Sequence, residues 1–236
     1  MHFAAPLRRG TLVRRYKRFL SDVELDGGEQ VIAHVANSGS MLGVSDPGLE
    51  VWLSHSAKPS RKLAWGWELV RVDGELVGVN TMHPNRIVGE AIAAGAIPEL
   101  DGYTEMRREV AYGGNSRIDL LLTSPHRPTC YVEVKNVHLK RGVFACFPDA
   151  VTARGTRHLA ELAAMAATGR RAVMLFLVQR QDCRLFAPAE DVDPVYAQSL
   201  HRAAAAGVEI LCYCCRLSLE GIVVDRPLPV QLNGTQ

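Results

Sequence analysis

The chain has 236 residues, of which 47% are hydrophobic, 22% charged and 6% aromatic. These proportions indicate an ordinary globular protein and exclude a disordered tail, a collagen-like repeat and a disulfide-stapled miniprotein. The longest apolar run, residues 172–178, is much shorter than the ~20 residues of a membrane-spanning helix, so we expect no membrane partner. The length permits one large domain or two modest ones.

The net charge of +2 hides an uneven distribution of basic residues. The first 20 residues contain no acidic side chain, whereas six of them are basic: Arg8, Arg9, Arg14, Arg15, Lys17 and Arg18. A second basic group consists of Lys58, Arg61 and Lys62. Such a distribution is typical both of a solvated, arginine-rich surface and of a surface that binds a polyanion, so charge alone does not decide between them.

The cysteines favour a reducing compartment. The chain contains six of them, three of which stand in Cys212-Tyr-Cys214-Cys215, and no histidine stands at zinc-ligand spacing. We therefore expect reduced, buried thiols rather than a metal cluster. The amino-terminal residues lack the long apolar segment of a secretory signal, so the expected location is the cytoplasm.

Short β-like runs dominate the sequence before residue 80. They end at Gly, Asp, Asn or Pro and predict strands at residues 11–18, 19–25, 30–35, 50–53, 63–72 and 76–79. Asp26-Gly27-Gly28 and Asp73-Gly74 indicate hairpin turns between strands. Short strands without a convincing helix indicate a small barrel.

Helices and strands alternate after residue 80. We expect helices at residues 84–94, from Pro148-Asp149 to Gly169, and at 194–206. The expected strands are residues 107–111, 117–122, 131–137, 172–178 and 208–213. This order is typical of an α/β layer domain. The segment after Arg226 is expected to be loose.

Two acidic residues stand on adjacent predicted strands. If the break at Ser124-Pro-His-Arg-Pro128 is a hairpin centred on residue 126, Asp119 lies opposite Glu133. The alternation of side chains along a strand then places Lys135 on the same face as both acids. Cross-strand Cβ atoms are only ~5 Å apart, and like charges at that distance destabilise the sheet.

A divalent cation would resolve this repulsion and also supply chemistry. Mg²⁺ and Mn²⁺ prefer oxygen ligands, and Lys135 could then stabilise an attacking water or a pentavalent phosphorus. Glu90, on the preceding predicted helix, could complete the acidic cluster. The alternative is a surface ion network in which Asp119 and Glu133 pair with Lys135 and Arg117, and the short spacing pattern does not exclude it.

The arrangement of Asp119, Glu133 and Lys135 resembles the PD-(D/E)xK nuclease-like superfamily. In that superfamily the metal ligands are typically the two carboxylates and the carbonyl of the residue between the glutamate and the lysine, which is Val134 here. The resemblance implies a restriction-endonuclease-like α/β domain.

Longer stretches resemble the bacterial sugar fermentation stimulation protein A family. In chain order they are RRYKRFLSDVEL, HVANSGSMLG, RKLAWGWELV, VGVNTMHPNRIVGEA, GGNSRIDLLL, CYVEVKNVHL, FPDAVTARGTRHLAEL and FLVQR, and the resemblance as a whole covers roughly residues 8–224. The resemblance implies an OB-type barrel, a nuclease-like domain, non-specific DNA binding and a role in the expression of sugar (notably maltose) utilisation genes. The run from His34 to Ser38 departs from the family, where a Cys-Pro-Asn-Thr-like run is expected.

The expected fold class is therefore a two-domain α+β protein. An OB-like β-barrel that binds nucleic acid is expected over residues 1–82. A PD-(D/E)xK α/β domain follows over residues 83–226, and residues 227–236 form the loose tail.

Basic residues are the expected contacts to DNA, because exposed cations that bind phosphates release counterions. In the barrel they are Arg14, Arg15, Lys17, Arg18, Arg61 and Lys62. Arg154 stands on the long predicted helix, one turn before His158. A solvated helix face is favoured there, and the alternative is a helix whose basic edge contacts DNA.

Two functions follow from these patterns. The first is a DNA-binding regulatory protein that retains a nuclease fold. The second is a DNA hydrolase that depends on Mg²⁺ or Mn²⁺, in which Asp119, Glu133 and Glu90 hold the metal and Lys135 supports the attacking water. Residues 216–225 offer a strand for a homodimer, although nothing in the sequence requires one.

Overall fold

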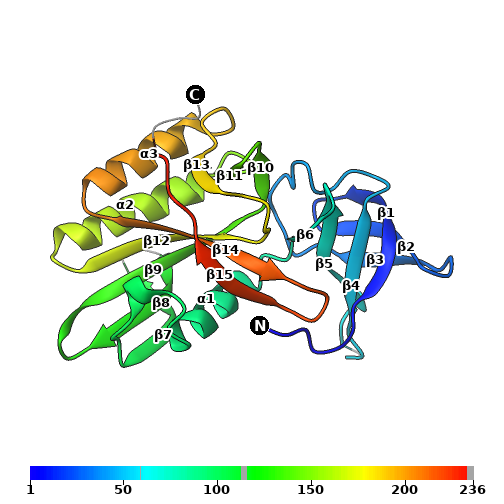
Figure 1. Cartoon of the computed structure of the whole chain (residues 1–236), viewed down its shortest axis with the longest axis horizontal. Helices are drawn as coiled ribbons and strands as arrows, with labels where there is room; N and C mark the ends of the chain where they lie inside the picture. The colour runs from blue at the N-terminus through cyan, green and yellow to red at the C-terminus, as the bar shows by residue number, and fades with distance from the viewer. Residues whose placement is uncertain (59, 113–115, 233–236) are drawn as a thin grey trace.

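The computed structural model describes residues 1–58, 60–112 and 116–232, which form two bodies side by side (Figure 1). The smaller body contains strands β1 to β6, and the larger contains the three α-helices. Residues 113–115, which begin the expected GGNSRIDLLL motif, lie outside the described residues. Within the described part of the chain, no helix is long and apolar enough to cross a membrane.

The smaller body is a closed β-barrel, as the sequence predicts. Its strands follow the order β3-β2-β1-β4-β5, and the pairing of β3 with β5 closes the barrel. Trp67 and Leu53 point into the barrel and are fully buried. The strands are β1 (Arg8–Tyr16), β2 (Leu20–Leu25), β3 (Gln30–His34), β4 (Glu50–His55), β5 (Trp65–Val72) and β6 (Glu75–Gly78), which extends the edge of β5.

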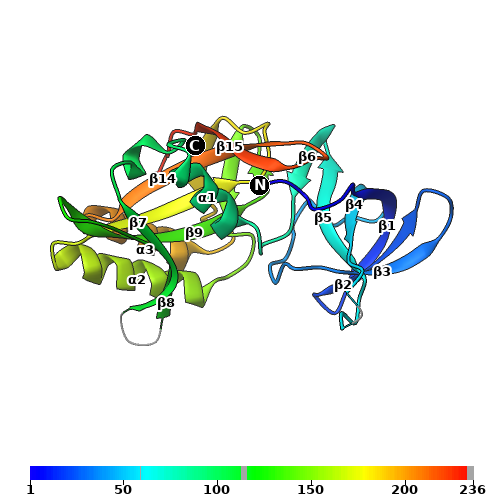
Figure 2. The same cartoon turned by 90° about the horizontal axis from the view of Figure 1, so that it is seen from below.

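The larger body is a six-stranded mixed sheet with helices on both faces (Figure 2). The strand order is β15-β14-β12-β9-β8-β7, and β12 runs parallel to both β9 and β14. Residues 172–178 of β12 are all apolar and buried, as expected for a strand whose two faces are both covered. The strands are β7 (Glu105–Tyr112), β8 (Ser116–Ser124), β9 (Arg127–Val137), β12 (Arg171–Val178), β14 (Glu209–Leu217) and β15 (Ile222–Pro227).

The three helices bury one apolar stripe each against this sheet. Ile87 of α1 (Pro84–Ala93) packs on one face of the sheet. A short 3-10 helix (Pro98–Leu100) follows α1 in the chain. Leu159 of α2 (Ala153–Ala167) and Leu200 of α3 (Pro194–Ala205) pack on the other. The expected two-domain fold class is confirmed.

α2 begins later than the sequence predicts. Its N-cap is Thr152, whose hydroxyl accepts a hydrogen bond from the Gly155 amide at 3.1 Å, rather than a residue near Pro148. Asp149 is instead used between the two bodies, since its carboxylate accepts a hydrogen bond from the Met41 amide at 2.8 Å. Periodicity could not reveal this tertiary contact.

Three short strands form a second sheet that the sequence analysis did not predict. They are β10 (Leu139–Arg141), β11 (Phe144–Phe147) and β13 (Leu185–Pro188). β10 follows β9 after a single residue, and β11 runs antiparallel to β10 and parallel to β13. Strands of three or four residues give too short a pattern for the alternation of side chains to be recognised.

Both ends of the described chain differ from expectation. Residues 1–3 pack on the larger body rather than the barrel, with His2 bridged to Gly221 and the Phe3 amide bonded to the Glu220 carbonyl at 2.9 Å. The segment expected to be a loose tail is packed as far as it is described. Leu228 is 4% exposed and Val230 forms a bridge with Phe186, because these apolar residues cover the edge of the larger body.

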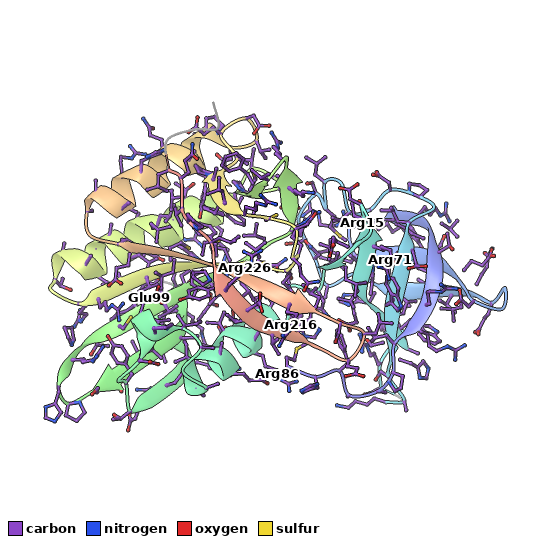
Figure 3. All side chains as sticks on the ribbon, viewed as in Figure 1. Arg15, Arg71, Arg86, Glu99, Arg216 and Arg226 are labelled. Atoms are coloured by element: carbon purple, nitrogen blue, oxygen red, sulfur yellow. The ribbon has the colours of Figure 1, made fainter. Side chains whose placement is uncertain are left out.

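Residues 216–225, considered as a dimer strand, form a hairpin within the chain. β14 pairs antiparallel with β15, and Arg216, labelled in Figure 3, lies opposite Val223. Within one copy of the protein, β14 and β15 therefore already pair with each other along one edge of each strand.

The central strand predicts where the fold is most sensitive to mutation. Leu175 of β12 is fully buried, so Leu175→Ala should lower the free energy of unfolding by ~2–5 kcal/mol, measured in urea. Leu219→Ala is the matched control, because Leu219 is 45% exposed. Similar losses in the two variants would contradict the placement of β12.

Candidate active site

The β8–β9 hairpin has the register that the sequence predicts. Leu120 lies opposite Val132 and Leu121 opposite Tyr131, as a hairpin centred on residue 126 requires. The regular pairing ends at Leu120, and beyond it the Asp119 carboxylate accepts a hydrogen bond from the Val134 amide at 2.8 Å. Because the N–H and C=O of one extended residue point toward the same neighbouring strand, the Val134 carbonyl also faces the Asp119 side of β9.

Glu133 is buried beside this contact, with 2% exposure. Its Oε1 accepts hydrogen bonds from Lys135 Nζ at 2.7 Å and from His158 Nδ1. Burial works to raise the pKa of Glu133, but His158 and Lys135 outweigh it and hold the pKa below its usual value. Its second oxygen, Oε2, is buried and has no hydrogen-bond partner among the described residues.

Asp119 has the opposite electrostatic balance. Burial and the negative charge of Glu133 raise its pKa to about 6, although hydrogen bonds from the Val134 amide and from Asn85 lower it. The Asn85 side-chain nitrogen lies 2.7 Å from Asp119 Oδ1. The two acids therefore repel each other in the way that their cross-strand positions predict.

The structure does not bring Glu90 to the acidic pair. Its carboxylate contacts the α-amino group of Met1 at 2.8 Å and Arg86 at 2.7 Å. Asn85, five residues earlier on α1, contacts Asp119 instead. Five residues turn an α-helix by about 140° beyond one full turn, so these two side chains cannot share a face.

His158 is a residue of this site whose role the sequence analysis missed. Its side chain is 4% exposed, which is at odds with the favoured solvated helix face. His158 Nε2 lies 3.3 Å from Nε of Arg154, one turn earlier, while Nδ1 contacts Glu133. The i, i+4 spacing of Arg154 and His158 was the available signal, but it did not reveal which residue turns inward.

A cavity of about 380 Å³ opens onto these groups, and we call it the crevice. Its lining combines residues 37–39 of the barrel with the larger body's Asp119, Glu133, Lys135 and Arg154. The site therefore lies where the two bodies meet.

The basic residues expected to bind DNA fall into two groups. Arg14 is paired with Asp22 at 2.7 Å, and Arg15 (Figure 3) donates to the carbonyls of Arg18, Asn37, Gly39 and Ser40 at 2.8–3.0 Å. Arg15 is thus a structural residue of the barrel loop. The other group is exposed and has no acidic partner among the described residues; it consists of Lys17 and Arg18 at the β1–β2 turn, Arg61, Lys62 and, on α2, Arg154.

The donor atoms at the acidic pair fit a hard divalent cation. No group of three or more His, Cys, Asp and Glu side chains within the described chain could hold a metal ion. The available set is two carboxylates and the Val134 carbonyl, and Mg²⁺ commonly binds through one or two carboxylates while it keeps several waters. The unpartnered oxygen of Glu133 is consistent with such a ligand.

Comparisons with known proteins agree with this architecture. A family model described as the SfsA N-terminal OB domain matches residues 13–79, and one described as the sugar fermentation stimulation protein RE domain matches residues 82–221. The chain belongs to the sugar fermentation stimulation protein family. The relatives of this family confirm the resemblance found in the sequence.

Two relatives and one structure illustrate the similarity. The sugar fermentation stimulation protein homolog of Paramagnetospirillum magneticum is 63% identical over 233 residues, 99% of each chain. That of Rhodospirillum centenum is 61% identical over 97% of this chain and 98% of its own. A solved structure of Pyrococcus furiosus SfsA in complex with Ca²⁺ matches with a TM-score of 0.89 and 28% identity over 98% of both chains.

The raised pKa of Asp119 predicts that the contribution of this residue to the stability of the metal-free protein falls as the pH rises from about 4 to about 7. The unfolded chain releases this proton near pH 3.8 and the folded protein only near about 6, so ionisation favours unfolding. Each unit of pKa difference changes the free energy of unfolding by about 1.4 kcal/mol, so the loss caused by Asp119 is at most about 3 kcal/mol. Urea unfolding in EDTA, for wild type and Asp119→Asn, measures it.

As the pH rises through this range, the free energy of unfolding of Asp119→Asn should increase relative to that of wild type. Any pH-independent difference that the new amide introduces does not affect this trend. Asp101→Asn, at an exposed position, is the matched control and should leave the pH dependence unchanged. A constant difference between Asp119→Asn and wild type would contradict the raised pKa.

Proposed function

We propose that this protein binds DNA and hydrolyses its phosphodiester bonds with the help of Mg²⁺ or Mn²⁺. The observation that carries the proposal is the acidic pair, in which the buried Glu133 Oε2 has no hydrogen-bond partner among the described residues and the pKa of Asp119 is raised to about 6. Leaving a buried charged oxygen without a partner is costly unless another ligand completes the site. The relative from Pyrococcus furiosus, solved with Ca²⁺, supports a divalent cation.

Asp119, Glu133 and the Val134 carbonyl would hold the metal. When bound, a divalent cation polarises a phosphoryl oxygen and lowers the pKa of a coordinated water. Asn85 orients the Asp119 carboxylate and His158 orients that of Glu133 through the contacts described above. These residues fix the donor atoms before substrate arrives, which reduces the cost of reorganisation.

Lys135 supplies the positive charge nearest to the acids. Its ammonium group lies 2.7 Å from Glu133 Oε1 and 3.4 Å from His158 Nδ1, and its side chain is 15% exposed at the crevice. A partly desolvated ammonium group stabilises the negative charge that develops on the phosphoryl oxygens during attack by water. Arg154, which also lines the crevice, can contact an adjacent phosphate.

DNA binding is assigned to the exposed basic residues of the barrel. Lys17, Arg18, Arg61 and Lys62 are all exposed, and their side chains form no hydrogen bond or ion pair with the described residues, so they can present their charges to phosphates. Arg14 could reach a phosphate only by leaving Asp22, and Arg15 only by releasing the loop carbonyls.

A second candidate function is regulation by DNA binding without cleavage. It is supported by the names of the relatives, which refer to stimulation of sugar fermentation. Under this proposal the barrel binds DNA near sugar-utilisation genes, such as those for maltose, in the cytoplasm. The acidic pair would then serve a structural cation.

The hydrolase proposal predicts metal-dependent cleavage of linear DNA. In Mn²⁺ the wild-type protein should degrade it, whereas Asp119→Asn and Lys135→Ala should each lower the rate by about 10²–10³-fold, because each removes charge stabilisation in the transition state. EDTA should abolish cleavage, and Mn²⁺ should raise the melting temperature of wild type but not of Asp119→Asn.

Asp101→Asn is again the control and should cleave like wild type. DNA that is bound but uncut in both Mg²⁺ and Mn²⁺ would contradict hydrolysis and favour the regulatory function. An unchanged melting temperature in Mn²⁺ would contradict the metal site itself.

The binding proposal predicts a change in salt dependence. Lys17→Ala with Arg18→Ala should weaken DNA binding and reduce the slope of log K against log salt by ~1–2, because each phosphate contact contributes about −0.9. Fluorescence anisotropy at several salt concentrations measures the slope. Arg127→Ala with Arg170→Ala removes two exposed charges from the end of the sheet far from the barrel and should leave the slope unchanged. An equal slope in both double variants would exclude the β1–β2 turn as a DNA contact.

A further inference from the structure

The crevice ends at a wall that the barrel supplies. Residues 37–41 of the barrel lie against Asp149, whose Oδ2 accepts the Met41 amide at 2.8 Å and whose carbonyl accepts the Ser40 hydroxyl. Gly39 permits this close approach, since a Cβ atom there would lie 2.6 Å from both carboxylate oxygens of Asp149. The loop of residues 37–41, the wall, is therefore in direct contact with the larger body.

Hydrogen bonds from the barrel hold the wall in place. Arg15 donates to the carbonyls of Asn37, Gly39 and Ser40, at 3.0, 2.9 and 3.0 Å. Asn37 is 3% exposed, and its side-chain nitrogen donates to the Val79 carbonyl at 3.0 Å. A loop with so many internal bonds has low local mobility, so it does not swing aside easily for a continuous duplex.

Polar atoms without partners lie between the acids and the wall. Along the chain from Glu133, the side-chain nitrogen of Asn136 and Nδ1 of His138 are buried and have no hydrogen-bond partner among the described residues. Both residues line the crevice, and the His138 side chain is only 4% exposed. Leaving buried polar groups of this kind unsatisfied destabilises the fold, which indicates that a polar ligand completes them.

The charges in the crevice are divided between its two ends. Lys135 and Arg154 stand near the acidic pair, where a phosphate is expected. The wall end instead carries Asp149: burial works to raise its pKa, but hydrogen bonds from His138 and the Met41 amide outweigh it and lower the pKa. An ionised carboxylate repels a second phosphate there and accepts a hydrogen bond from a hydroxyl group.

We propose that the crevice binds the terminal nucleoside of a nucleic-acid strand, with its base and sugar against Asn136, His138 and the wall. The last phosphodiester then lies at Asp119 and Glu133. A volume of about 380 Å³ is at the small end of ligand pockets, which span ~300–1,000 Å³, and suits one nucleoside rather than a base pair.

This inference rests on the proposed function and specifies its substrate as a strand end. In the reaction, a water oxygen forms a bond to phosphorus, and the bond from phosphorus to the bridging oxygen of the penultimate sugar breaks, so the phosphate leaves with the terminal nucleoside. The departing oxygen takes up a proton, so that each turnover consumes one water and releases one mononucleotide.

Binding of deoxyadenosine in EDTA tests the crevice separately from the metal chemistry. NMR titration should shift the side-chain amide of Asn136, and Ser38→Leu, which narrows the crevice from an exposed position on the wall, should weaken binding at least tenfold. Gln198→Leu, a polar-to-leucine change on the exposed side of α3, should leave binding unchanged. No shift at Asn136, or equal binding by both variants, would overturn the proposal.

Circular single-stranded DNA tests the requirement for an end. In Mn²⁺, linear DNA should yield mononucleotides, whereas a covalently closed circle of the same sequence should stay intact. Cleavage of the circle at a comparable rate would overturn the proposal. If deoxyadenosine binds as expected but neither DNA is cut, the nucleoside pocket stands and the hydrolysis of the proposed function fails.

Discussion

Repulsion between a buried and a partly buried carboxylate is the constraint on which the site depends. Asp119 and Glu133 lie on neighbouring strands, and each is held by different partners. Glu133 stays ionised because Lys135 and His158 compensate its burial, whereas the pKa of Asp119 rises to about 6. The sheet, α1 and α2 all contribute side chains whose common effect is to keep this unfavourable pair in place.

The strand part of the site could be predicted because it depends on local rules. Side chains alternate along a strand, and the hairpin fixes the register, so Asp119, Glu133 and Lys135 follow from the sequence. The helix part could not be predicted in this way. The choice of Asn85 over Glu90 depends on how α1 is rotated against the sheet, and the inward turn of His158 depends on the packing of α2.

The same distinction applies to the basic residues. The sequence shows a cluster of basic residues near the amino terminus, but it does not show which of them already form hydrogen bonds or ion pairs within the protein. Arg15 lies in that cluster and donates hydrogen bonds to four carbonyl groups, while Lys17 and Arg18, two and three positions later, are exposed. Contacts between residues far apart in the chain decided this, as they did for Asp149 and the start of α2.

Gly39 joins the two bodies through the absence of a side chain. Its backbone approaches Asp149 so closely that the barrel contributes a boundary to a crevice whose reactive groups all belong to the larger body. Under the proposed function, the barrel would take part in selecting the substrate through this boundary, while the reacting groups would belong to the larger body. One can change over evolution while the other is preserved, provided that this small contact persists.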